Sequence, residues 1–184
     1  TALANKGAVL AEMHQLSQAV ALYDEGLVIL RRLIEQENHR ELEPNLAGIL
    51  NRKGNTLYKM DQPSQAIAIW DECIVIYRRL VKKEGRSELE PDLANVLMNK
   101  ATALRDMGQF PQTVMLHDES IAIYRQLVEQ KGRHDLKNKL TNAIEEKKIV
   151  TQVLSYSDEQ RKSLIAIMKL LKGIDFSGAK IKSS

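Results

Sequence analysis

The sequence of 184 residues contains a single cysteine, Cys73, so no disulfide can form within the chain. It has no apolar run long enough to cross a bilayer, and no signal peptide opens it. Aromatic residues make up only 4%, which suits helices packed through Leu, Ile and Ala better than a β-sandwich. The net charge of +3 is too small to indicate nucleic-acid binding. We therefore expect a cytoplasmic helical protein without a membrane span.

The motifs of common enzyme classes are also missing. The sequence has no glycine-rich phosphate loop and no Gly-x-Ser-x-Gly. None of the four histidines lies four residues from another His or Cys, as metal ligands on a helix often do: His14, His39, His117 and His134. Carboxylates recur with an internal repeat, whereas a catalytic pair needs one geometry and not three. We expect no catalytic residue, no metal, no cofactor and hence no enzyme.

What the sequence does have is a strict repeat. The stretch Lys53–Glu72 (KGNTLYKMDQPSQAIAIWDE) resembles Lys6–Glu25 and Lys100–Glu119, and each copy begins 47 residues after the previous one. A fixed period of this length is typical of stacked helical units, each of which buries its apolar face only against its neighbours.

Apolar residues at helical spacing divide each unit into two helices. Pro44, Pro63, Pro91 and Pro111 lie where a helix would begin, and proline is tolerated in a first helical turn. The predicted helices cover residues 1–14, 17–37, 44–60, 63–85, 91–108 and 111–132. We expect one repeat domain over residues 1–174, with units at about 1–43, 44–90, 91–137 and 138–174, and a loose C-terminal tail at 175–184.

The residues at the centre of each unit resemble the tetratricopeptide repeat. The family pattern appears as Gly54-x-x-Leu57 followed by Ala66-x-x-x-Trp70, and again as Gly7-x-x-Leu10 with Ala19-x-x-x-Tyr23. The period exceeds the usual length of about 34, as in long-helix bacterial variants of the family. The resemblance implies an all-α, right-handed solenoid of antiparallel helix pairs, with three good repeats and one degenerate capping repeat.

The resemblance also implies where a partner would bind. Members of the family usually hold a peptide or a partner helix in the concave groove lined by their first helices. The positions that match are Asn51, Asn55, Tyr58, Lys59, Met98, Thr102 and Arg105. The first copy offers only Ala4, Ala8 and Ala11, so the lysine and asparagine of a carboxylate clamp are missing.

The expected function is therefore a protein–protein interaction scaffold that binds another protein or peptide in this groove. One alternative is a ligand-sensing regulatory module of a larger signalling ATPase or protease. A lesser alternative is an RNA-binding helical repeat, which would need a basic inner face studded with aromatic residues, whereas the groove positions include only Tyr58.

Two sets of charges recur with the period. Lys6, Lys53 and Lys100 match one another, as do Asp24, Asp71 and Asp118, and we interpret them as structural ion pairs rather than ligand-binding lysines. Arginine pairs close the second helices at Arg31–Arg32 and Arg78–Arg79, where cations favour the helix dipole. The alternative for the arginines is a basic convex stripe that attracts an acidic partner.

Three further positions have structural interpretations. His117 replaces Trp70 and Cys73 matches the small residues Gly26 and Ser120, so both are predicted to pack in the core. Ser157 and Gln160 resemble a capping box that opens the last helix, in which Leu164 matches Trp70. We expect this helix to cap the solenoid, the alternative being a membrane-surface helix. Its additional apolar residues, Ile165 and Leu170, offer a homodimer contact or a docking face for another domain.

Overall fold

The computed structural model describes residues 2–172, and for residues 168–172 it describes the helical backbone alone. The predicted tail at 175–184 lies outside the described residues. The α-helices are α1 (Ala2–Glu12), α2 (Leu16–Gln36), α3 (Glu43–Lys59), α4 (Pro63–Glu84), α5 (Glu90–Asp106), α6 (Phe110–Arg125), α7 (Lys137–Leu154) and α8 (Asp158–Lys172). Short 3₁₀ turns precede α3, α5 and α7, and α6 passes into a π-helical segment, Gln126–Gln130. No strand occurs between residues 2 and 172.

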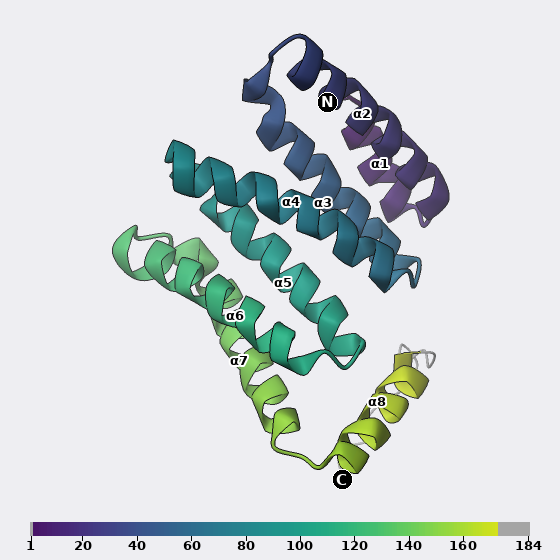
Figure 1. Cartoon of the computed structure of the whole chain (residues 1–184), viewed down its shortest axis with the longest axis vertical. Coiled ribbons are helices and arrows are strands. Elements are labelled where there is room, and N and C mark those ends of the chain that lie inside the picture. Colours follow the sequence, from purple (N-terminus) through teal and green to yellow (C-terminus); the bar gives the residue numbers. More distant parts are fainter. Residues whose placement is uncertain (1, 173–184) are drawn as a thin grey trace.

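The helices form a stack of hairpins. Helices α1 and α2, α3 and α4, and α5 and α6 pack as pairs, and each second helix packs against the first helix of the next pair (Figure 1). One apolar cluster runs without interruption from Ala4 in α1 to Ala103 in α5. The structure is therefore the all-α helical solenoid that the 47-residue period predicts.

The turns repeat as strictly as the helices. Pro44, Pro63, Pro91 and Pro111 each occupy one of the first positions of a helix. Every turn within a hairpin contains one residue with a positive φ, and so does every turn between hairpins: His14, Asp61 and Gly108 in the first set, and Asn38, Gly85 and Gly132 in the second. The same left-handed conformation at matched positions gives each unit the same geometry.

The two helices of a hairpin approach closely at a small residue. A Cβ atom added to Gly54 in α3 would lie 2.7 Å from Cδ1 of Trp70 in α4. One added to Gly7 in α1 would lie 2.7 Å from Cε1 of Tyr23 in α2. Because real Cβ atoms do not approach this closely, glycine at these positions allows the aromatic ring of the second helix to lie on the backbone of the first.

The fourth unit differs from the other three. Its helix α8 does not pack on α7 as a hairpin partner, and the helix whose backbone α8 contacts most is α5. Figure 1 shows α8 turning away from α7 at the end of the stack. Leu164 and Ile165 pack beside Phe110 at the start of α6 and Val150 near the end of α7. The expectation that Leu164 takes the place of Trp70 against the preceding helix is therefore not met.

The sequence of α7 explains this departure. Lys148 stands where Gly54 and Ala101 allow close approach in the second and third units, and it is exposed. Ile144, which matches the fully buried Leu97, is 41% exposed. A lysine in place of a small residue prevents the close approach of a second helix, so α7 itself ends the hairpin stack and leaves Ile144 partly exposed.

Candidate partner-binding groove

The predicted groove residues lie on α3 and α5, the first helices of the second and third hairpins. These two helices are in contact, and α1 is in contact with α3, so the first helices form one continuous side of the stack. We call this side the inner face. It combines a cluster of amides, an ionic network and one exposed lysine.

The amide cluster joins α3 to α5. The side-chain amide of Asn99 donates hydrogen bonds to Oδ1 of Asn51, at 3.1 Å, and to Oδ1 of Asn55, at 2.9 Å. All three side chains are partly exposed. An amide has two donor hydrogens and an oxygen with two lone pairs, so the cluster keeps hydrogen-bonding capacity directed at solvent.

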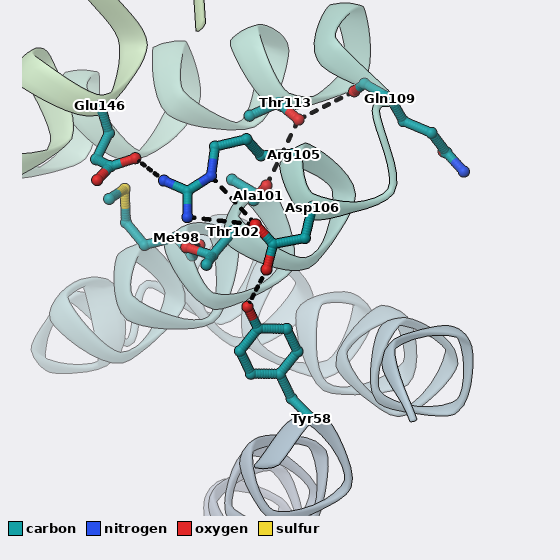
Figure 2. Close-up of polar contacts among 9 residues, drawn as sticks. All are labelled: Tyr58, Met98, Ala101, Thr102, Arg105, Asp106, Gln109, Thr113 and Glu146. Carbon is teal, nitrogen blue, oxygen red and sulfur yellow. Dashed lines mark hydrogen bonds and ion pairs between the residues drawn. The ribbon is translucent and has the colours of Figure 1, made fainter. Parts of the chain in front are cut away.

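The ionic network crosses three helices (Figure 2). The hydroxyl of Tyr58 in α3 donates to Oδ2 of Asp106 in α5. Arg105 contacts Oδ1 of Asp106 at 3.4 Å and forms an ion pair with Glu146 in α7. The side chain of Asp106 is only 8% exposed, so its charge is held by the tyrosine and the arginine. The cation of Arg105 is therefore already neutralised within the protein.

The remaining predicted residues lie in three different surroundings. The sulfur of Met98 contacts Nδ1 of His117 at 3.3 Å and Oγ of Ser120 at 3.2 Å, so this side chain packs between α5 and α6. The hydroxyl of Thr102 donates to the backbone oxygen of Met98, 3.1 Å away, within its own helix. Lys59, at the end of α3, is exposed.

Sequence reasoning missed Asn99, Asp106 and Glu146, which hold the groove residues in place. Glu146 follows Arg105 by 41 residues, which is also the separation of Arg31 from Glu72 and of Arg78 from Glu119. The residues one unit before Arg105 and Glu146 are Tyr58 and Asn99, so the repeat carries no signal for this pair.

The recurring lysines form the predicted ladder. Lys53 pairs with Asp24 at 2.5 Å, Lys100 pairs with Asp71, and Lys147 in α7 pairs with Asp118 at 2.5 Å. Each lysine therefore reaches the hairpin before its own. The structural interpretation is confirmed for Lys53 and Lys100. It does not hold for Lys6, which is exposed and forms no ion pair with another described residue.

The arginines of the second helices are paired as well. Arg31 donates two hydrogen bonds to Glu72, and Arg78 contacts Glu119 with both Nε and Nη2. Arg79 forms ion pairs with Glu43 and Glu84. These arginines therefore do not form a convex stripe of unpaired cations.

The two predicted core positions are buried. His117 is 1% exposed, and burial lowers the pKa of its imidazole below the ordinary value. The thiol of Cys73 is fully buried and donates to the backbone oxygen of Ala47 at 3.1 Å, and burial raises its pKa. A thiol in this state is a poor nucleophile.

Comparison with known proteins places these elements in a family. The sequence model of the tetratricopeptide repeat matches residues 46–85 and 93–134, which are the helix pairs α3–α4 and α5–α6. None of the curated proteins matches the chain.

Among the described residues, no group of three or more His, Cys, Asp or Glu could hold a metal ion. In the same part of the chain, every helix is too short or too polar to cross a bilayer.

Proposed function

The chain belongs to the tetratricopeptide repeat family through its second and third helix pairs, and we propose that it is a non-catalytic scaffold that binds a peptide or a helix of another protein on its inner face. Tetratricopeptide repeats generally mediate protein–protein interactions. The proposal assigns the partner to the inner face, between the amide cluster on α3 and α5 and the exposed Lys59.

The observation that carries the proposal is the amide cluster of Asn51, Asn55 and Asn99. Amides pair well with backbone N–H and C=O groups, which are free in an extended peptide but already used inside a helix. The cluster therefore supports an extended segment as the bound form more than a helix. Backbone recognition of this kind gives affinity, while flanking side chains give specificity.

The charges of the inner face support a partner that is not strongly charged. Arg105 is held by Asp106 and Glu146, and Tyr58 donates to the same aspartate. Lys59 remains as an exposed cation beside the amides. An RNA-binding role, which needs a row of available cations and stacking aromatics, receives less support from this arrangement.

The experiment selects a binding peptide from a random displayed library and measures its affinity by calorimetry. Charge reversal of Lys59 should weaken binding, and Asn55→Leu should weaken it without changing net charge. The matched control is Lys83→Glu, because Lys83 is exposed on α4 in the second helix of the same hairpin. Unchanged affinity in both inner-face variants would show that the groove is not the site.

A further inference from the structure

The surface at the start of the stack is open at positions whose counterparts on the interior hairpins are mostly covered. We define the leading face as the residues of α1 and α2 that correspond to interface positions of the later hairpins: Ala2, Asn5, Lys6, Val9, Glu12 and Glu25. Val9 is 54% exposed, whereas the matching residues are Thr56 at 3%, Ala103 at 0% and Val150 at 0%. Ala2 is exposed as well, and its counterparts Ile49, Val96 and Ala143 are buried.

The polar residues of the leading face match groups that bond to a preceding hairpin. Asn5 corresponds to Asn99, which donates to Asn51 and Asn55. Lys6 corresponds to Lys100, which pairs with Asp71. Both Asn5 and Lys6 are exposed, and no hydrogen bond or ion pair within the described residues involves their side chains.

The acidic residues follow the same rule. Glu12 corresponds to Asp106, which accepts the hydroxyl hydrogen of Tyr58 in the preceding hairpin. Glu25 corresponds to Glu119, which pairs with Arg78 of the preceding hairpin. At Lys6, Val9 and Glu25 the leading face thus repeats the cation, the buried centre and the carboxylate found at both interior interfaces. Asn5 and Glu12 match the third hairpin only, because the second hairpin carries the exposed residues Arg52 and Lys59 at these positions.

We propose that the leading face is a docking surface for one further helix pair of the same 47-residue repeat, placed before α1 in the stack. This occupant would present a carboxylate to Lys6, a guanidinium to Glu25 and an apolar surface to Val9. A second copy of this chain does not offer that chemistry, because its matching carboxylates Asp24, Asp71 and Asp118 are already paired with lysines.

The second hairpin provides a ready test of this complementarity. A copy of residues 44–94 joined directly before Thr1 is in register, because Thr1 then follows Ala94 as Asn95 does in the chain. The copied Asp71 falls 29 residues before Lys6, and the copied Arg78 falls 41 residues before Glu25, which are the separations of the existing pairs.

The extended and the 184-residue proteins are compared by thermal unfolding, each with and without Val9→Lys. We expect the extension to raise the melting temperature. We also expect Val9→Lys to lower the melting temperature by at least about 4 °C in the extended protein and by less than about 1 °C in the 184-residue protein, because only the extension buries this side chain. Equal effects in the two proteins would overturn the proposal.

Two further measurements address the occupant itself. The natural reading frame should encode Asp or Glu 29 residues before Lys6 and Arg or Lys 41 residues before Glu25, and a frame without them would reject the proposal. Light scattering of the 184-residue protein should show a monomer. A dimer that Val9→Lys dissociates would instead assign the leading face to self-association and would likewise reject it.

Discussion

The ammonium group of Lys53 lies 2.5 Å from the carboxylate of Asp24, and the two residues belong to different hairpins. Lys53 is 17% exposed and Asp24 is 50% exposed, so the pair is half open to solvent. The aliphatic stem of Lys53 lies along the junction between α2 and α3, while its ammonium group contacts the carboxylate of Asp24 at the edge. The same contact joins every later hairpin to the one before it.

Replacing Lys53 by methionine should change the free energy of unfolding by about 0–1 kcal/mol, because a solvent-screened pair contributes little while the methionine retains the apolar stem. A cycle with Asp24→Asn, measured by urea unfolding, isolates the ionic part. Affinity for a selected peptide should follow stability. Lost binding with an unchanged melting curve would assign Lys53 to ligand recognition.

Gly54→Ala should destabilise the protein by about 1–3 kcal/mol, because its Cβ would meet the rigid indole ring of Trp70 at 2.7 Å. The control is Gly48→Ala in the same helix, where the nearest atom to an added Cβ is the hydroxyl of Tyr77, 4.0 Å away. Gly48→Ala should stabilise the protein by about 0.5–1 kcal/mol, because alanine has a higher helix propensity than glycine.

The third hairpin suggests a rescue of the Gly54 variant. It carries Ala101 and His117 at the positions of Gly54 and Trp70, so a larger residue on the first helix accompanies a smaller ring on the second. Trp70→His in the Gly54→Ala background should therefore recover part of the loss in denaturant unfolding. A fully additive pair of losses would contradict the steric explanation.

The fold was predictable because each local signal agreed with the period. Prolines mark the helix starts, and the predicted helix bounds agree with those observed within a few residues except at the end of α6. The position of α8 was not predicted, although Lys148 carried the information. The helix itself was predicted correctly, but α7 lacks the surface on which α8 was expected to pack.

The candidate site was less accessible to sequence reasoning. Asn51, Asn55 and Tyr58 could be placed on one face of α3 from helical periodicity. Their partners Asn99 and Asp106 lie on the next hairpin, and which side chains meet depends on how far one hairpin is rotated against the other. Periodicity within one helix does not contain that rotation.

Ser157→Ala should loosen α8 without unfolding the stack. The Ser157 hydroxyl accepts from the backbone N–H of Gln160 at 3.3 Å, and the Gln160 side chain accepts from the backbone N–H of Ser157 at 2.9 Å, which forms the predicted capping box. Loss of such a cap costs about 1 kcal/mol. Hydrogen exchange should accelerate in residues 158–172 and remain unchanged in α3 and α4.

The control for this variant is Ser155→Ala. The Ser155 hydroxyl donates to the backbone oxygen of Gln152 at the end of α7 and takes no part in the α8 cap. Exchange in α8 should be the same as in the unchanged protein. Equal acceleration by both substitutions would show that the turn as a whole, and not the cap, holds the start of α8.

His117 should make stability fall at mildly acidic pH. Burial lowers the pKa of its imidazole, and the nearby cations Arg105 and Lys147 act in the same direction, while the carboxylates Glu146 and Asp118 oppose them. The folded protein therefore binds the proton less readily than the unfolded chain, in which the pKa is about 6.5. The free energy of unfolding should hold above this pH and decrease as the pH falls below it.

Urea unfolding of the protein and of His117→Phe between pH 8 and pH 5 measures this contribution. The difference between the two curves should be constant above about pH 7 and then change with a slope of at most about 1.4 kcal/mol per pH unit, the limit for one proton. Every ionisable group other than His117 is present in both proteins, so its contribution cancels in the difference. Parallel curves across the whole range would mean that the pKa of His117 is the same in the folded and unfolded states. That result would contradict the burial of its side chain between α5 and α6.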